Sequence, residues 1–202
     1  QPSLEAQISN IADEIAYNHH DLDDGLRSGL ITIGEILDLK AAENAAKEVL
    51  SLRSPQLMDK SRVNSEIIRR MISSQIEDLV RQTKKNVLSS AVTSLADVRN
   101  STNQIVSFSP KTKDNVRELK SFLMHRLYKN PKVRSLTDVA EIVIEDLFSI
   151  FFNEENSEDK DPMQHLRSVA DKIASLTDSS AVKLHKQFFP DKELWPDPLF
   201  WG

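Results

Sequence analysis

Four polar side chains near the start of the chain have the spacing of one helical face. They are Asp13, Tyr17, Asp21 and Asp24. At about 100° per residue, separations of four, four and three positions place them one above the other. Like charges at such spacing repel, and a facing cation or hydrogen-bond donor would relieve that repulsion. The alternative is a solvated acidic surface, which spacing alone favours.

The doublet His19-His20 is a second candidate for chemistry. Adjacent side chains point about 100° apart on a helix, so these imidazoles cannot bind one metal ion together as histidines four positions apart do. The dipeptide His20-Asp21 has the composition of a metal-binding pair, but we interpret it as accidental. The other histidines, at 125, 165 and 185, are scattered and are expected to be structural or exposed.

Basic side chains gather where the longest apolar pattern begins. They are Lys60, Arg62, Arg69 and Arg70. A helix N-terminus favours anions, so the helix dipole does not explain these cations. Arginine forks suit phosphate oxygens, which makes the cluster a candidate polyphosphate site. The favoured alternative is a solvated surface with ion pairs to Glu66 or Glu77.

The elements that must position these groups are predicted to be helices. Residues 3–20 repeat apolar side chains at spacings of four, three and four, with Ser3 as N-cap. The segment Asp23-Asp24-Gly25 predicts a break or a new cap, followed by a short turn or helix ending at Gly29. Further helices are predicted at residues 33–51, 61–96, 111–129, 135–152, 163–176 and 178–188. With only four glycines and few alternating β-branched runs, the sequence favours an all-α fold.

Bulk composition excludes several classes of protein. The formal net charge of −5 argues against a dedicated nucleic-acid binder. The chain has no cysteine, which excludes disulfides and thiolate metal sites and fits a reducing cytoplasm. It has no apolar run of the length that spans a membrane, about 18 residues or more. Because the first residue is Gln1, we expect a piece of a longer protein.

The first 30 residues resemble the deoxyguanosine-triphosphate triphosphohydrolase-like family of HD-domain metallohydrolases. The similarity is carried by Ala-Asp-Glu-Ile-Ala-Tyr at 12–17 and by His-Asp-Leu-Asp-Asp-Gly-Leu at 20–26. It continues in order through Ile-Glu-Asp-Leu-Val at 76–80, Glu-Leu-Lys-Ser-Phe-Leu at 118–123, Tyr128, and Val-Ala-Asp-Lys-Ile-Ala-Ser-Leu-Thr-Asp at 169–178. The resemblance therefore covers nearly the whole chain.

The resemblance implies an all-helical enzyme that cuts a deoxynucleoside triphosphate into deoxynucleoside and triphosphate. It implies one divalent metal ion, such as Mg²⁺ or Mn²⁺, held by two histidines and two aspartates. Asp13 matches the last aspartate ligand, Tyr17 the tyrosine that lines the substrate, and Asp21 the carboxylate that accepts the deoxyribose 3′-hydroxyl. The carry-over to Lys60, Arg62, Arg69 and Arg70 is looser, and phosphate contact there is an expectation only.

The family's first histidine and its His-Asp pair have no counterpart in this chain. The resemblance therefore implies a C-terminal part without the N-terminal helices that carry the first ligands. We expect residues 1–30 to be the last HD-domain helix, 31–189 the helical C-terminal region and 190–202 an extended tail. One carboxylate is too few for a tight metal site. We therefore expect this chain alone to bind no stoichiometric catalytic metal and to hydrolyse no deoxynucleoside triphosphate.

The parent protein is expected to be a cytoplasmic, homo-oligomeric bacterial enzyme whose partner is its nucleotide substrate, with no membrane association. Two alternatives stay open at this point. One is a non-catalytic helical interaction module. The other is a nucleic-acid-binding relative, which the acidic charge disfavours.

Overall fold

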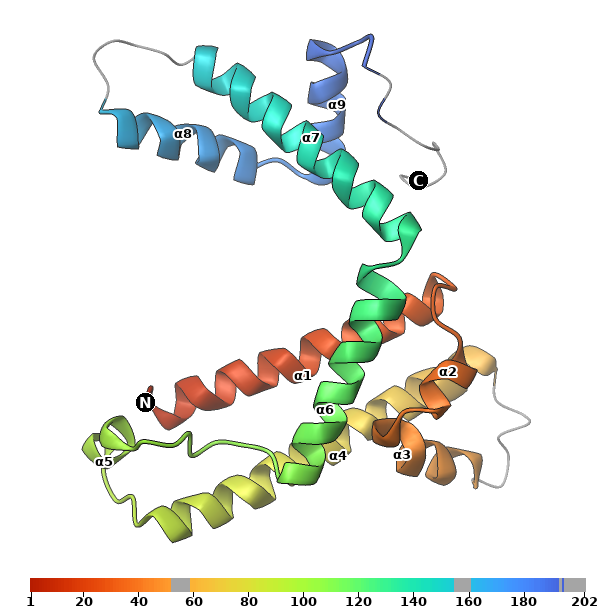
Figure 1. Cartoon of the computed structure of the whole chain (residues 1–202), viewed down its shortest axis with the longest axis vertical. Coiled ribbons are helices and arrows are strands. Elements are labelled where there is room, and N and C mark those ends of the chain that lie inside the picture. Colours follow the sequence, from red (N-terminus) through yellow and green to blue (C-terminus); the bar gives the residue numbers. More distant parts are fainter. Residues whose placement is uncertain (52–58, 155–160, 193, 195–202) are drawn as a thin grey trace. The chain divides into compact units, whose positions relative to one another are not determined.

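The computed structural model describes residues 1–51, 59–154, 161–192 and 194 (Figure 1). Within those ranges all regular structure is helical, which confirms the all-α prediction. The chain divides into two compact units, Gln1–Asn130 and Pro131–Gly202. This division by contacts differs from the functional one drawn at residue 30, because the first helix packs against elements that follow it.

Helix α1, Leu4–Arg27, carries the acidic stripe. The Ser3 hydroxyl accepts a hydrogen bond from the Ala6 N–H at 3.3 Å, which confirms the predicted N-cap. The break predicted at Gly25 is wrong, because the helix continues to Arg27. Gly25 is buried, and a Cβ there would lie 2.5 Å from Cδ1 of Ile31. Its lack of a side chain lets the returning chain pack against the helix.

Two predicted helices are split in the structure by local capping. The helix predicted at 33–51 is two helices, because Leu39 is extended between them. The helix predicted at 61–96 ends at Ser90, where Ala91 adopts a left-handed conformation with φ of 51°. Asp97 then accepts the backbone N–H groups of Thr93 and Ser94 at 3.0 and 2.8 Å and starts a new helix. The helices are α2 (Ile33–Leu37), α3 (Lys40–Leu50), α4 (Lys60–Ser90) and α5 (Leu95–Asn100).

Helix α6, Pro110–Leu123, continues into a wider π-helical turn, η2, Met124–Tyr128. Ser109 caps α6, and the buried carboxylate of Asp78 accepts the Ser109 N–H at 2.8 Å. Helices α1 and α3 each pack against both α4 and α6, and α1 and α4 run in opposite directions (Figure 1).

Two apolar clusters hold this first unit together. The first cluster joins the C-terminal end of α1 to α2, α3, α4, α6 and η2, and includes Leu22, Ile31, Ile36, Val49, Ile67, Met71, Leu119, Leu123 and Leu127. The second cluster joins the N-terminal half of α1 to α4, α6 and the segment before α6, and consists of Ile11, Ile15, Leu79, Val106, Phe108 and Val116. One edge of α1 is therefore fixed along its length, which leaves the other edge to solvent.

The second unit contains three described helices, α7 (Pro131–Glu154), α8 (Pro162–Ala174) and α9 (Asp178–Phe188). Its core consists of Val139, Val143, Leu147, Phe151 and Val169. Prolines 131 and 162 occupy first-turn positions, where their missing N–H costs nothing.

A polar network around Asp146 joins α7 to α9 and to the residues after it. The His185 ring is fully buried, and its Nε2–H donates to the Asp146 carboxylate at 2.6 Å. The Lys192 ammonium donates to the same oxygen at 2.5 Å. Burial raises the pKa of Asp146, but the hydrogen bonds from Lys192 and His185 outweigh it and leave that pKa below its usual value.

Some expectations concern residues that lie outside the described ranges. Most of the acidic segment 153–161 is among them, as are the tail aromatics Trp195, Phe200 and Trp201. None of the described helices combines the length and the apolarity that crossing a bilayer requires.

Replacing Asp146 by Ala is expected to loosen α9. The substitution removes the acceptor of two charge-assisted hydrogen bonds and leaves the His185 imidazole buried without its partner. The free energy of opening of α9 should fall by about 2 kcal/mol, measured by native-state hydrogen exchange of its backbone amides. Asp138→Ala, at an exposed position on the same helix, is the control. Equal α9 protection in the two variants would contradict the assignment.

Candidate functional face of helix α1

Because α1 is continuous from Leu4 to Arg27, Asp13, Tyr17 and Asp21 lie along one face of it. Asp13 is exposed, the Tyr17 side chain is 57% exposed, and Asp21 is half-buried. The face therefore becomes more enclosed toward the C-terminal end of the helix. Asp13 and Asp21 are eight residues apart, which is about 12 Å along the axis. A single metal ion cannot contact both carboxylates at that separation.

Tyr128 of η2 closes the more buried end of this face. Its hydroxyl donates a hydrogen bond to Oδ2 of Asp21, across 107 positions of sequence. Its ring stacks on that of Tyr17, with centroids 6.5 Å apart and planes inclined by 27°. Burial, together with the neighbouring Asp21 and Tyr17, raises the pKa of Tyr128 far above its usual value. The phenol therefore stays protonated and remains a donor.

Sequence reasoning gave no role in the site to Tyr128. The spacing of apolar residues in 111–129 places it on the inward side of a helix, and the structure does pack it beside the first cluster. The available signal was its rarity, since Tyr17 and Tyr128 are the only tyrosines of the chain. Their contact depends on how α1 and α6 pack, which spacing along the chain does not reveal.

His19 and His20 have different surroundings. The His19 side chain is 1% exposed, and its Nδ1 lies 2.7 Å from the carbonyl oxygen of Ile15. A carbonyl can only accept, so Nδ1 carries the proton and Nε2 is the unprotonated nitrogen of the neutral ring. Burial lowers the pKa of His19, and the hydrogen bond to Ile15 opposes that effect only in part. His20 is exposed on the neighbouring face.

The described residues do not fit a complete metal site. Among them no group of three or more His, Cys, Asp or Glu side chains is arranged to hold a metal ion. Asp13 offers one carboxylate, fewer ligands than Mg²⁺ or Mn²⁺ takes.

The basic cluster lies on α4, and its members have different surroundings. Lys60 and Arg62 are exposed in the first turn. Arg69 donates to Glu66 through Nε at 3.0 Å, and Arg70 donates to Glu66 at 3.0 Å and to Glu48 of α3 at 2.6 Å. Hydrogen bonds from Arg69, with the charges of both arginines, lower the pKa of Glu66. A phosphate at Arg69 or Arg70 would have to compete with these carboxylates.

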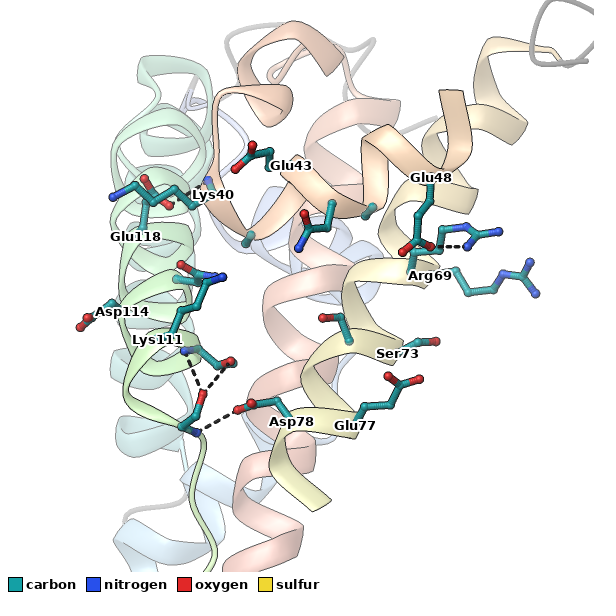
Figure 2. A pocket seen from close by; sticks show the side chains of 18 of the residues that line it. Lys40, Glu43, Glu48, Arg69, Ser73, Glu77, Asp78, Lys111, Asp114 and Glu118 are labelled. Atoms are coloured by element: carbon teal, nitrogen blue, oxygen red, sulfur yellow. Dashed lines mark hydrogen bonds and ion pairs between the residues drawn. The ribbon is translucent and has the colours of Figure 1, made fainter. Parts of the chain in front are cut away.

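Arg69 and Arg70 line a groove of about 970 Å³ between α3, α4 and α6. Figure 2 shows the groove, with Lys40 and Glu118 on one side and Glu48 and Arg69 on the other. Seven carboxylates and five basic side chains line it, and none of the lining residues belongs to α1. Within the described structure, the arginines and the stripe of Asp13, Tyr17 and Asp21 therefore belong to separate surfaces.

Comparison with known proteins connects these features to a family. A family model described as a phosphohydrolase-associated domain matches residues 106–187. A deoxyguanosinetriphosphate triphosphohydrolase-like protein of Thiobacillus denitrificans is 40% identical over 200 residues, which cover 96% of this chain and 52% of that protein. Proteins of the same name from Azoarcus sp. strain BH72 and Bartonella quintana are 38% and 34% identical, over 96% and 92% of this chain and 52% and 48% of their own length.

The chain belongs to the deoxyguanosinetriphosphate triphosphohydrolase-like family. It spans about half the length of the curated relatives it matches. The matched phosphohydrolase-associated domain contains Tyr128 but none of Asp13, Tyr17 and Asp21. The contact between Tyr128 and Asp21 therefore joins that domain to α1, which lies outside it.

Acidification is expected to destabilise the first unit through His19. Because burial lowers its folded-state pKa, the unfolded chain binds the proton first, and stability is lost as the pH falls from about 6.5 toward the lower folded-state pKa. His19→Asn keeps a donor near the Ile15 carbonyl but does not titrate there, so its urea stability should fall less between about pH 7 and about pH 5. Circular dichroism measures the unfolding.

His20→Asn is the matched control for this experiment, because it removes an exposed imidazole from the adjacent position. It should retain the wild-type dependence of stability on pH. If His19→Asn and His20→Asn show the same slope, the buried ring is not the source of the effect.

Proposed function

We propose that this chain forms the sugar-binding side, and supplies one metal ligand, of a metal-dependent deoxynucleoside-triphosphate triphosphohydrolase. In that reaction water replaces the nucleoside 5′-oxygen on the α-phosphorus, and the products are a deoxynucleoside and inorganic triphosphate. The names of the relatives support a phosphohydrolase of this kind. We also propose that the complete protein is cytoplasmic and homo-oligomeric and acts on free nucleotides.

The observation that carries the proposal is the arrangement of Tyr17, Asp21 and Tyr128 at one end of the α1 face. An ionised carboxylate accepts hydrogen bonds from hydroxyl groups, and it repels phosphates. This end therefore suits the neutral, hydroxyl-bearing part of a nucleotide. The exposed Tyr17 ring beside it offers a flat apolar surface for a sugar.

Asp13 lies at the other end of the same face, about 12 Å along the axis from Asp21. A nucleoside with its first phosphate groups is long enough to reach from Asp21 to Asp13, whereas a single metal ion cannot contact both. We assign Asp13 as one ligand of a divalent cation at the phosphate end, where the other ligands come from residues outside the described structure. Phosphate contacts by Lys60, Arg62, Arg69 and Arg70 remain the looser part of the proposal, given the ion pairs of the two arginines.

This 202-residue chain by itself is expected to be inactive. It should release no triphosphate from dGTP in the presence of Mg²⁺ or Mn²⁺ and retain no stoichiometric metal after gel filtration, because one carboxylate is insufficient. Ion chromatography of triphosphate and elemental analysis measure the two quantities. Stoichiometric metal together with multiple turnovers by the pure chain would refute the expectation.

In the complete product of the gene, Asp13→Ala is expected to abolish bound metal and activity together. Loss of one ligand weakens the cation, and without it the reaction lacks its charge stabilisation, so activity should fall by at least about 100-fold. Asp114→Ala is the control, since it removes an exposed carboxylate from α6 whose ion pair with Arg117 contributes little. Retained metal and turnover in Asp13→Ala would remove Asp13 from the ligand set.

A further inference from the structure

We infer that Tyr128 is a positioning residue for Asp21, and that it makes the site select ligands with a sugar 3′-hydroxyl. Its hydroxyl engages Oδ2 of Asp21 and leaves Oδ1 to accept from the ligand. This inference rests on the proposed function, and it assigns a role to a residue outside α1.

The backbone of η2 is what brings Tyr128 to this place. The Lys129 N–H bonds to the Met124 carbonyl at 3.0 Å, five residues back, where an α-helix would bond four residues back. The extra residue shifts everything after it by about 100° around the axis. Leu123 and Leu127 remain buried in the first cluster, and Tyr128 follows directly at the Asp21 end of α1. Such wide turns recur at functional sites.

The chemistry of the pair restricts what Asp21 can do. A phenol has one proton to donate, and here that proton goes to Asp21. Because the pKa of Tyr128 is raised by burial and by the neighbouring Asp21, the donor is present throughout the physiological range. The carboxylate is thereby held in one orientation before a ligand arrives, and such preorganisation reduces the entropy lost on binding.

The ring and the hydroxyl of Tyr128 have separable roles. The ring packs against the first cluster and stacks on Tyr17, so it contributes to folding. The hydroxyl donates to the Asp21 carboxylate and also has the Tyr17 hydroxyl as a hydrogen-bond neighbour. Tyr128→Phe therefore retains the packing and removes the hydroxyl that orients Asp21.

The test compares two substrates in the complete gene product, dGTP and its analogue without the 3′-hydroxyl, 2′,3′-dideoxy-GTP. Wild type should prefer dGTP in kcat/KM. Tyr128→Phe should reduce that preference by about tenfold, equivalent to about 1.4 kcal/mol, by lowering kcat/KM for dGTP while leaving the dideoxy analogue nearly unchanged. A purely structural defect would lower both values equally, and that result would overturn the inference.

A double-mutant cycle with Asp21→Asn sharpens this test. If Tyr128 acts through Asp21, the double variant should show the same loss of preference as Asp21→Asn alone, since the tyrosine then has no carboxylate to orient. Additive losses would show that Tyr128 acts independently of Asp21 and would overturn the inference.

An absorbance titration of the 202-residue chain separates this inference from the proposed function. In a Tyr17→Phe background Tyr128 is the only tyrosine. Burial raises the pKa of Tyr128 in both proteins, but the ionisation should begin at a lower pH with Asp21→Asn than with Asp21, because the substitution removes the negative charge and the acceptor, while circular dichroism shows both proteins folded. Identical titrations would overturn the inference. An inactive complete protein with the expected titration would instead defeat the proposed function and leave the Tyr128–Asp21 contact established.

Discussion

The first unit depends on α1 remaining one unbroken helix past Gly25. The absence of a side chain at Gly25 allows Ile31 to approach within the space of a Cβ, and Ile31 then enters the same cluster as Leu22. A larger residue would force the Ile31 side chain to shift and would disturb that cluster. This packing sets the geometry of the polar face, because Asp21 directly precedes Leu22 in the helix and its direction is fixed when Leu22 is buried.

The two edges of α1 illustrate how stability and function divide a single helix. One edge buries Ile11, Ile15 and Leu22, and each such side chain contributes about 1.5–3 kcal/mol on burial. The other edge carries like charges whose repulsion costs only a few tenths of a kcal/mol per pair. Burial outweighs repulsion by roughly an order of magnitude, so an acidic face can be kept on a stable helix. The hydrogen bond from Tyr128 further offsets the repulsion at its most buried carboxylate.

Local patterns in the sequence predicted what depends on neighbours along the chain. Helix positions, the Ser3 cap and the shared face of Asp13, Tyr17 and Asp21 follow from spacing alone, as does the pairing of Glu66 with Arg69 and Arg70. The failures have local or long-range causes. In the sequence, a glycine that ends a helix cannot be distinguished from a glycine that lets another segment approach the helix closely. The Asp97 carboxylate decides the end of α4 through hydrogen bonds that compete with helix continuation. Contacts such as Tyr128 with Asp21 and Arg70 with Glu48 join distant positions, so no pattern along the chain specifies them.

The separation of the two acidic positions argues for two roles rather than one. Asp13 is exposed, whereas Asp21 is half-buried and held by a phenol that stays protonated. A metal ligand must turn its lone pairs toward a cation that several groups share, and an exposed carboxylate keeps that freedom. A carboxylate that already accepts a phenolic proton is oriented for a further neutral donor. Under the proposed function Asp13 marks the phosphate end and Asp21 the sugar end of one helix, and the difference in their surroundings comes from what packs beside each carboxylate.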